Sequence, residues 1–283
     1  MNLLKNRTLK ELTTFKIGGC AKYFFAPQTF DEMKEALKFA NESNLKFFIL
    51  GKGSNILFDD DGFNGIVIQN NISFFKISKN NVFVGGGYSF PNLGLKTASL
   101  NLSGLEFALG IPGSVGGAVY MNASSFDRSV SDVLKKVVVL DEFGKVQVID
   151  KKNIEFAYRF SSFQKTRSVI LSAQFELQND NNVKEKQSEM LQKKIRTQPM
   201  NEKNAGCVFK NPKGYSAGRL IEECGLKNYS VGGARVSSLH ANFIINANNA
   251  TAQDVIKLIS DIKGVVKKEK NILLEEEIKI IKC

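Results

Sequence analysis

Residues 110–123 read GIPGSVGGAVYMNA, and no other stretch of this sequence says as much about its fold. Four of the residues are glycine, namely Gly110, Gly113, Gly116 and Gly117, and Pro112 fixes one backbone angle. Glycine weakens any helix or strand that it interrupts, so the cluster needs a geometric reason. One reason is a bent backbone whose N–H groups receive a phosphate or a cofactor. The other is a tight loop that packs without binding anything, and the spacing alone leaves both interpretations open.

A second glycine-rich turn, Gly51–Asn55, follows directly after the apolar run KFFIL at 46–50. It begins like a dinucleotide-binding fingerprint, but Ile56 stands where the third glycine belongs. It also lacks the Gly-Lys-Ser/Thr ending of a P-loop. What remains is a strand followed by small residues with backbone donors, and Ser54 and Asn55 can add side-chain bonds to phosphate. Two such turns would suit a diphosphate, which has two anionic centres.

The composition is that of a protein with real hydrophobic cores. The 283 residues are 43% hydrophobic and 24% charged, and this length suffices for two or three domains. Charges interrupt the N-terminus every few residues, and no apolar run approaches the ~20 residues that span a bilayer. Four cysteines without a Cys-x-x-Cys pair, together with one histidine, argue against a metal site. We therefore expect a cytoplasmic protein without membrane insertion and without a metal.

The formal net charge of +11 leaves two classes of partner to weigh. Nucleic acid is one, because its phosphates attract basic proteins. The lysines are scattered, however, and the densest run, Lys267–Lys270, is short and contains an acidic residue. A diffuse basic surface attracts small anions equally well. We expect an anionic small molecule as the partner, and no nucleic acid.

The order of apolar patterns predicts a mixture of helices and strands. Thr29 and Glu32 have capping-box spacing and open a helix whose apolar residues recur up to Ala40. Further helices are expected at 183–195, at 216–224 with Gly225 as the stop, and from Thr251 onward. Strands are expected at 46–50, 65–69, 82–84, 169–177 and 273–281, with a hairpin over 137–149 that turns at 141–144. Domain borders are expected at 178–185 and at 198–199.

Several motifs follow one another in an order that resembles a known family. They are Gly19-Cys-Ala, the turn at 51–55, the segment 110–123, Tyr158-Arg-Phe-Ser161, Ala205–Pro212, Ala217–Glu222, Gly232–Asn246 and Leu274–Ile278. Each motif is weak alone, but together they cover nearly the whole chain. In this order the sequence is similar to the UDP-N-acetylenolpyruvoylglucosamine reductase (MurB) family, the flavoenzymes of peptidoglycan precursor synthesis.

The resemblance implies an α+β fold with a two-part FAD-binding module of the vanillyl-alcohol-oxidase/PCMH-like type. Residues 1–68, joined by the C-terminal strand 278–283, would form its first part, and residues 69–182 its second. Residues 183–277 would form a smaller α+β substrate-binding domain. Because Tyr158–Ser161 runs into the 169–177 strand without a long insertion, the chain is similar to the shorter, type II branch. We expect a monomer.

The reaction implied by the resemblance is an NADPH-dependent reduction. NADPH would reduce FAD, and the reduced flavin would pass hydride to the enolpyruvyl ether of UDP-N-acetylglucosamine enolpyruvate, giving UDP-N-acetylmuramate. The protein must then position two partners, stabilise charge on the enolpyruvyl carboxylate and supply a proton. Since His240, the single histidine, lies far in sequence from both glycine turns, we expect FAD to be bound non-covalently.

Three residues match the catalytic positions of the family. Arg159 would stabilise charge, because a guanidinium is always protonated and matches a carboxylate with two donors. Glu277 matches the carboxylate that precedes a branched apolar residue in the closing strand. The proton donor departs from the family pattern, which has a hydroxyl residue where this sequence has Cys207. A thiol, with an ordinary pKa of ~8.5, is a stronger acid than an alcohol and can take over the role.

The resemblance also assigns binding residues. Cofactor contacts fall on the Gly51–Asn55 turn and on the 110–123 segment: Gly51, Lys52, Gly53, Ser54, Asn55, Ile111, Pro112, Gly113, Ser114, Gly116, Gly117, Ala118 and Asn122. Substrate contacts fall on Tyr158, Lys194, Gln198, Lys210, Asn211 and Lys279.

Two other interpretations of the sequence remain. One is another oxidase or dehydrogenase with non-covalent FAD, from the same superfamily. The other is a basic nucleic-acid-binding protein, which accounts for the charge of +11 but not for the glycine turns. A flavin spectrum separates the two flavoprotein interpretations from the nucleic-acid one.

Overall fold

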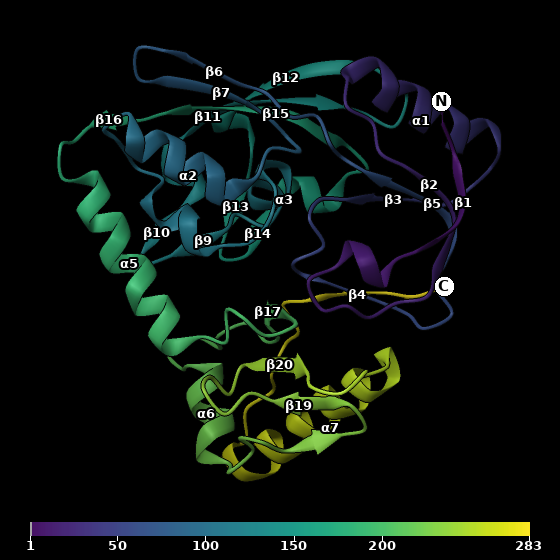
Figure 1. Cartoon of the computed structure of the whole chain (residues 1–283), viewed down its shortest axis with the longest axis vertical. Helices are drawn as coiled ribbons and strands as arrows, with labels where there is room; N and C mark the ends of the chain where they lie inside the picture. The colour runs from purple at the N-terminus through teal and green to yellow at the C-terminus, as the bar shows by residue number, and fades with distance from the viewer. Residues whose placement is uncertain (1) are drawn as a thin grey trace. The chain divides into compact units, whose positions relative to one another are not determined.

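The computed structural model describes residues 2–283, which divide into two compact units. The first unit contains residues 2–4, Tyr23–Lys52 and Gly65–Lys193. The second contains Lys5–Lys22, Gly53–Asn64 and Lys194–Cys283, so each unit gathers segments that are distant in the sequence. Figure 1 shows the elements of both. The chain crosses from one unit to the other within the Gly51–Asn55 turn and again near the end of α5 (Val183–Thr197).

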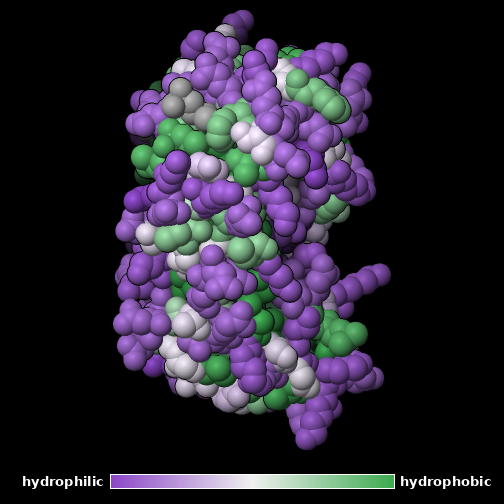
Figure 2. Space-filling model, turned by 90° about the vertical axis from the view of Figure 1, so that its right-hand side faces the viewer, coloured by the Kyte–Doolittle hydropathy of each residue, from purple (hydrophilic) through white to green (hydrophobic). Residues whose placement is uncertain are grey.

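Hydrophilic side chains cover most of the face drawn in Figure 2. Over residues 2–283, no helix is both long and apolar enough to cross a membrane. The four cysteines are free thiols, and no group of three or more metal-binding side chains occurs among these residues.

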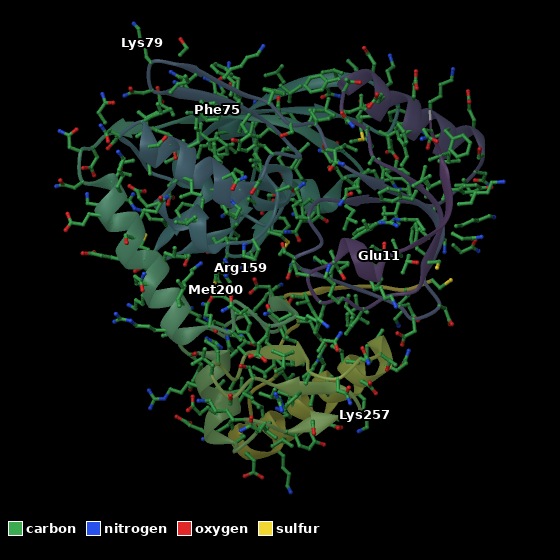
Figure 3. The ribbon with its side chains drawn as sticks, viewed as in Figure 1. Glu11, Phe75, Lys79, Arg159, Met200 and Lys257 are labelled. Carbon is green, nitrogen blue, oxygen red and sulfur yellow. The ribbon has the colours of Figure 1, made fainter. Side chains whose placement is uncertain are left out.

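A five-stranded antiparallel sheet forms the centre of the first unit. Its strands, in spatial order, are β12 (Val146–Asp150), β11 (Leu134–Leu140), β15 (Val169–Glu176), β7 (Asn81–Gly85) and β6 (Phe75–Ser78). Lys79 lies at the turn that joins β6 to β7 (Figure 3). The predicted 137–149 hairpin is confirmed, with Val137 opposite Ile149 and Leu140 opposite Val146.

Helices cover both faces of this sheet. On one face, α2 (Phe90–Ser99) and α3 (Val115–Tyr120) pack apolar residues such as Phe90 and Val119 against Val137 and Phe175. On the other face, α1 (Phe30–Glu42) buries one side of the helix, with Met33, Ala36, Leu37 and Ala40. The predicted start of α1 is confirmed, because the Thr29 side chain accepts a hydrogen bond from the Glu32 N–H.

A second sheet has the order β1 (Leu4–Thr8), β2 (Cys20–Phe25), β5 (Phe63–Gln69) and β3 (Phe47–Leu50). The predicted strand at 46–50 is therefore confirmed as β3, and it runs parallel to β5. A short turn of 3-10 helix, Lys10–Leu12, lies between β1 and β2.

The first unit also contains several short elements. They are β8 (Leu102–Ser103), the 3-10 turn Glu106–Gly110, β9 (Ser124–Ser125), β10 (Arg128–Ser129), α4 (Val130–Val133), the 3-10 turn Lys151–Asn153, β13 (Phe156–Ala157), β14 (Phe160–Ser161), the 3-10 turn Ser162–Lys165 and β16 (Gln178–Asn179). β9 pairs with β10, β13 with β14, and β16 with β8. Sequence patterns did not predict these two-residue strands, because they are too short to show a period.

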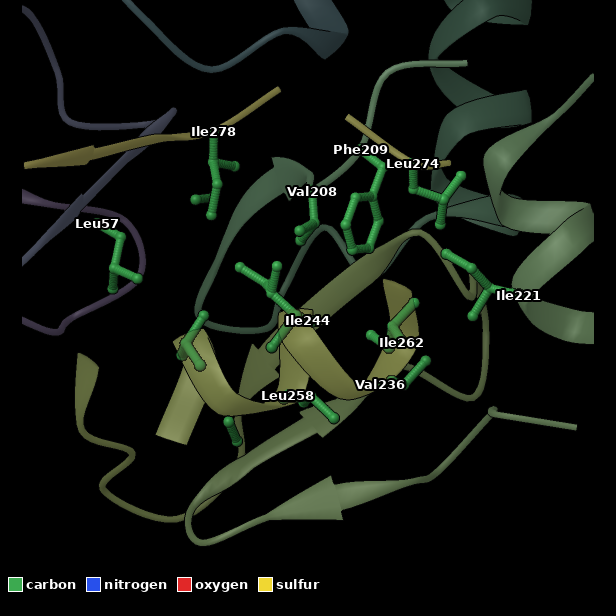
Figure 4. Close-up of a cluster of buried hydrophobic side chains, with 14 of the residues drawn as sticks. Leu57, Val208, Phe209, Ile221, Val236, Ile244, Leu258, Ile262, Leu274 and Ile278 are labelled. Atoms are coloured by element: carbon green, nitrogen blue, oxygen red, sulfur yellow. The ribbon is translucent and has the colours of Figure 1, made fainter. Parts of the chain in front are cut away.

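The second unit packs helices against a four-stranded antiparallel sheet (Figure 1). The strands, in spatial order, are β17 (Asn204–Cys207), β20 (Phe243–Asn246), β19 (Ala234–Val236) and β18 (Ser230–Val231). The helices are α6 (Ala217–Glu223) and α7 (Ala252–Lys270). Figure 4 shows the buried core, in which Val236 and Ile244 of the sheet meet Leu258 and Ile262 of α7.

Two separate segments cap the start of α7. Thr251 and Asp254 form a capping box, and the helix begins where the sequence predicted it. Asp60, from the loop after β4 (Ile56–Phe58), accepts hydrogen bonds from the Ala252 and Gln253 N–H groups. A carboxylate at a helix N-terminus is favourable because it meets unpaired donors and the positive end of the dipole.

The prediction of one continuous strand over 273–281 is wrong. The segment changes partners: the Glu275 carbonyl accepts from the Lys210 N–H and the Glu277 N–H donates to the Val208 carbonyl, whereas β21 (Lys279–Ile281) runs parallel to β4. The alternation that suggested a strand is still partly present, since Leu274 and Ile278 are both buried in the core of Figure 4. The alternating pattern therefore predicted which side chains are buried, but it did not predict that the segment changes its hydrogen-bonding partner.

Candidate active site

The two glycine-rich turns meet in the first unit, at Gly51 and Ser114. A Cβ atom on Gly51 would lie 2.4 Å from the Ser114 Oγ, a distance that real Cβ atoms do not tolerate. Ser114 is itself fixed, because it is buried and its Oγ accepts from the Gly117 N–H at the start of α3. Glycine at position 51 is thus what allows the end of β3 to approach the 110–123 segment.

The first-turn amides of α3 are already bonded within the protein. The Val115 N–H donates to the Tyr88 carbonyl (2.9 Å), and the Gly116 N–H donates to the Gly86 carbonyl (2.7 Å). The Gly117 N–H donates to Ser114 Oγ at 3.3 Å. Before the helix, the Ile111 N–H donates to the Ala108 carbonyl (3.0 Å) and Pro112 has no N–H. A phosphate at this segment would therefore be received by the Gly113 and Ser114 amides rather than by these amides of α3.

A third glycine run, Gly85–Gly87, lies against the same segment and was missed by the sequence reasoning. A Cβ on Gly86 would lie 2.2 Å from the Ile170 carbonyl oxygen, so this position accepts only glycine. The Gly86 carbonyl is also the acceptor of the Gly116 N–H. The signal was present in the sequence as three consecutive glycines at the end of a predicted strand.

Gly53 and Asn55, in the later part of the Gly51–Asn55 turn, belong to the second unit. Gly53 has φ +66°, and a Cβ there would lie 2.3 Å from the Leu12 carbonyl oxygen. The Asn55 Nδ2 donates to the Glu277 carbonyl (3.2 Å), and the Asn55 carbonyl accepts from the Lys279 N–H (2.9 Å). Asn55 thus fixes the main chain on both sides of Ile278. Of the other two turn residues, Lys52 is exposed and Ser54 is half-buried.

Cys207 lies at the end of β17, where the pairing with β20 is irregular. Asn204 pairs with Ile245 and Cys207 with Phe243, so the β17 segment carries one extra residue. Gly206 takes up the bend with φ +79°. The thiol of Cys207 is half-buried and not in a disulfide. The bulge thus lies directly at the side chain that we expect to act as the proton donor.

Glu277 lies on the chain segment beside Val208. Its N–H donates to the Val208 carbonyl at 2.7 Å, and its carbonyl accepts from Asn55. Since Cys207 precedes Val208, a thiol and a carboxylate flank one backbone hydrogen bond within the second unit. Among the three neighbouring acidic residues, Glu275 is engaged with Lys210 and Glu276 with Lys263.

Arg159 lies at the turn of the β13–β14 hairpin and is labelled in Figure 3. Its backbone has φ +57°, which is uncommon for a residue with a Cβ. Its Nη1 donates to the Ser124 Oγ (2.6 Å) and to the Ser124 carbonyl (3.2 Å). The guanidinium carbon also lies 5.2 Å from the centre of the Tyr158 ring, which is half exposed. The two residues of this motif therefore support each other at an accessible turn.

Asn122 supports the same hairpin. Its Nδ2 donates to the Ala157 carbonyl (3.0 Å), and its Oδ1 accepts from the Ser131 N–H (3.1 Å). The side chain is buried, so both polar atoms are satisfied inside the protein. The structure gives Asn122 a role in placing Tyr158 and Arg159, and a cofactor contact by this residue stays a prediction.

The predicted substrate residues other than Tyr158 belong to the second unit. Lys194 is buried in α5, and Gln198 follows one turn later, its N–H donating to the Lys194 carbonyl at 2.8 Å. Lys210 forms an ion pair with the exposed Glu275. The Asn211 Oδ1 accepts from the Ala217 N–H at the start of α6, and Lys279 is half-buried in β21.

His240 is hydrogen-bonded and packed within the second unit. Its Nδ1 accepts from the Asn242 N–H at 3.2 Å, and a Cβ on Gly218 would lie 3.0 Å from its ring. Burial lowers the pKa of the imidazole, and the nearby Lys227 charge lowers it further. The ring is therefore neutral in the folded protein at pH 7.

Two residues of these surroundings escaped the sequence reasoning, Ser124 and Asn242. Ser124 directly follows the glycine-rich segment, but nothing in its sequence marks it as a partner of a residue 35 positions later. Asn242 lies within the 232–246 motif, where its buried side chain bonds the Phe209 backbone. An isolated Ser or Asn has no sequence signal for such contacts.

Comparison with known proteins shows the family of the chain. Residues 21–150 match the model of an FAD binding domain, and residues 198–281 match that of the UDP-N-acetylenolpyruvoylglucosamine reductase C-terminal domain. UDP-N-acetylenolpyruvoylglucosamine reductase of Protochlamydia amoebophila is 48% identical over 277 residues, which cover 98% of this chain and 93% of the relative. The enzyme of the same name from Chlamydia felis is 43% identical over 96% of this chain and 92% of its own length.

A solved structure gives the same result for the fold. The crystal structure of UDP-N-acetylenolpyruvylglucosamine reductase (MurB) from Thermus caldophilus superposes with a TM-score of 0.85 at 34% identity, covering 99% of this chain and 98% of that one. The α+β fold expected from the sequence is confirmed, with an FAD-binding domain followed by a family-specific C-terminal domain. The chain belongs to the UDP-N-acetylenolpyruvoylglucosamine reductase (MurB) family of oxidoreductases.

Proposed function

We propose that this chain reduces UDP-N-acetylglucosamine enolpyruvate to UDP-N-acetylmuramate, with NADPH as the source of hydride. The observation that carries the proposal is the placement of Cys207 and Glu277 on the two segments joined by the Glu277–Val208 hydrogen bond. A proton donor and a carboxylate are the groups that addition of hydrogen across a polarised C=C bond requires of the protein. Membership of the family supplies the substrate class.

The FAD-binding domain fits a cofactor with a diphosphate. Gly51 allows a contact with Ser114 that a Cβ would prevent, so two bent backbone segments can lie close together and face the same anion. The Gly113 and Ser114 amides would receive phosphate oxygens, Ile111 and Pro112 would line the same segment, and Lys52 and Ser54 would contribute charge and a hydroxyl. FAD, when bound, supplies the hydride that reaches the substrate.

Arg159 is assigned to the enolpyruvyl carboxylate. Negative charge develops there when hydride adds to the terminal vinyl carbon, and a guanidinium offers parallel donors to both carboxylate oxygens. The two bonds from Nη1 to Ser124 go to uncharged oxygens, so they hold the guanidinium without cancelling its charge. Tyr158 lies beside it as a second contact for the same part of the substrate.

Cys207 is assigned as the proton donor. Its Sγ–H bond breaks as the proton is transferred to the carbon next to the one that received hydride, leaving a thiolate that regains a proton from water. Glu277 is assigned as the second acid–base group, and its main chain is held from both sides by Val208 and Asn55. One hydride and one proton thereby balance the reduction of the C=C bond.

The remaining assignments concern the nucleotide sugar. Lys194, Lys210 and Lys279 offer charges that suit a diphosphate, and Gln198 and Asn211 offer amides that suit a sugar or a uracil. NADPH carries a diphosphate as well, so the same cations would serve both ligands in turn.

The test uses the flavin spectrum under anaerobic conditions. Purified protein supplied with FAD should be yellow, NADPH should bleach it faster than NADH does, and UDP-N-acetylglucosamine enolpyruvate should restore the colour. Cys207→Ala should still be bleached by NADPH but should recover its colour far more slowly, and Cys207→Ser should recover normally. Normal recovery in Cys207→Ala would show that the thiol is not the proton donor.

A further inference from the structure

Ser124 bonds the guanidinium of Arg159. Ser124, in β9, offers both its hydroxyl and its carbonyl oxygen to the Arg159 Nη1, at 2.6 and 3.2 Å. Arginine has four rotatable side-chain bonds, so an exposed guanidinium samples many positions and loses entropy when it is fixed. Two acceptors from one residue on one nitrogen define both the position and the plane of the group.

The backbone on both sides of this contact is held in uncommon conformations. Arg159 has φ +57°, and in the β9–β10 hairpin Phe126 and Asp127 have φ +53° and +56°. Such conformations are unfavourable in a residue with a Cβ and persist where surrounding structure imposes them. The main-chain oxygen of Arg159 is itself fixed by the Gln164 Nε2 at 2.9 Å. The fold thus fixes Arg159 at its backbone, while Ser124 fixes its tip.

The chemistry of the partner is also specific. A carboxylate would hold Arg159 more strongly but would compete with a bound anion for its charge. A hydroxyl and a carbonyl oxygen accept hydrogen bonds without carrying a net charge. Ser124 therefore orients the guanidinium without adding a negative charge that would compete with a ligand.

Resting on the function proposed above, we propose that Ser124 is a positioning residue that presents Arg159 to the carboxylate of the substrate. Ser124 itself does not touch the reacting atoms. Loss of its hydroxyl should weaken binding of the carboxylate and slow reduction of the C=C bond, because a contact that orients the guanidinium before the substrate binds is then lost. Reduction of the flavin by NADPH needs no such carboxylate contact and should not change.

The experiment compares four single variants, Ser124→Ala, Ser124→Thr, Ser125→Ala and Arg159→Ala, with the double variant Ser124→Ala/Arg159→Ala. Ser125 is the matched control, because it is the neighbouring serine in β9 and pairs with Arg128 instead. Two rates are measured by stopped flow on the FAD-loaded protein: bleaching by NADPH and recovery of colour with UDP-N-acetylglucosamine enolpyruvate. Calorimetry then gives Kd values for UDP-N-acetylmuramate, which has the carboxylate, and for UDP-N-acetylglucosamine, which lacks it.

In Ser124→Ala the recovery of colour should slow about 10- to 100-fold, as expected for loss of a hydrogen bond to a charged group. The Kd of UDP-N-acetylmuramate should rise while that of UDP-N-acetylglucosamine and the bleaching rate stay unchanged. Ser124→Thr keeps the hydroxyl and should remain close to the unsubstituted protein, as should Ser125→Ala. In the Arg159→Ala background, removal of the Ser124 hydroxyl should have almost no further effect, because the two residues act as a unit.

Three results would overturn this role while leaving the proposed function intact, and the first two are kinetic. They are normal recovery in Ser124→Ala when Arg159→Ala is slow, or full additivity of the two substitutions. An equal rise in the Kd of both nucleotide sugars would likewise show that Ser124 only maintains the fold. By contrast, if Arg159→Ala recovered its colour normally, the proposed role of Arg159 would fail, and with it the role of Ser124.

Discussion

The side chain of Asn242 bonds the backbone of Phe209 at both of its polar groups. The Asn242 Oδ1 accepts from the Phe209 N–H at 2.9 Å, and its Nδ2 donates to the Phe209 carbonyl at 2.8 Å. The Asn242 carbonyl also accepts from the Val208 N–H. Because Cys207 precedes these residues and Glu277 pairs with Val208, one buried amide fixes the strand on which both proposed acid–base groups depend.

Replacement of Asn242 by alanine should therefore lower stability markedly. It removes two hydrogen bonds and leaves the polar groups of Phe209 buried without partners, at a cost of about 2–4 kcal/mol in the free energy of unfolding. The midpoint of thermal unfolding should fall by several degrees. Asn248→Ala is the matched control, because Asn248 is exposed and bonds Gly233 only through the main chain. Equal midpoints for the two variants would contradict the importance of this contact.

Gly51→Ala should weaken binding of FAD. The new Cβ would lie 2.4 Å from Ser114 Oγ, so the two glycine-rich segments would have to separate. We expect the Kd for FAD, measured by fluorescence quenching, to rise at least tenfold, since a shift of a few tenths of an ångström in each segment disturbs several contacts at once. The double variant Gly51→Ala/Ser114→Ala should regain part of the affinity, because it removes the clashing atom.

Gly264→Ala is the control for this substitution. Gly264 lies inside α7, where a Cβ would meet no atom within 4 Å, and alanine is the better helix former. Binding of FAD should be unchanged, and unfolding should require up to about 1 kcal/mol more. If Gly51→Ala bound FAD as tightly as Gly264→Ala does, close approach at Gly51 would not matter for the cofactor.

Asn55→Ala should show whether Asn55 supports Glu277 or contacts FAD directly. In the structure the Asn55 Nδ2 donates to the Glu277 carbonyl. The sequence had assigned this side chain to the cofactor. We expect the recovery of colour by the enolpyruvyl substrate to slow about tenfold, consistent with the loss of one hydrogen bond, and the Kd for FAD to change less. A large rise in the FAD Kd with normal recovery would favour the direct cofactor contact instead.

His240 should titrate below its ordinary range. Burial lowers the pKa of the imidazole, Lys227 adds to this, and Glu222 opposes it. The unfolded chain binds a proton near pH 6.5 while the folded chain does not, so stability is full above that pH and declines as the pH falls toward the lower, folded pKa. As His240 is the only histidine, its NMR titration is unambiguous, and the hydrogen bond to Nδ1 predicts a proton on Nε2. A pKa at or above 6.5 would contradict this.

The sequence predicted those features that depend on residues close together in the chain, such as the ends of helices. Thr29 and Glu32 predicted the start of α1, and Gly225, with φ +72°, ends α6 as expected. It also predicted that Gly51 and the 110–123 segment act together, because clustered glycine implies close approach. It did not predict the change of partner within 273–281, since alternate burial looks the same whether a strand has one partner or two. Nor could it pair Ser124 with Arg159, because their contact depends on the packing of two short hairpins.

The most direct measurement of the proposed reaction is a single turnover. The FAD-loaded protein is reduced anaerobically with one equivalent of NADPH and mixed with UDP-N-acetylglucosamine enolpyruvate, and the absorbance of oxidised flavin is followed together with the product by mass spectrometry. We predict that oxidised flavin returns in step with one equivalent of UDP-N-acetylmuramate, whereas UDP-N-acetylglucosamine, which lacks the C=C bond, leaves the flavin reduced. A flavin that stays reduced with the enolpyruvyl substrate, or that reoxidises without forming the product, would contradict the proposed function.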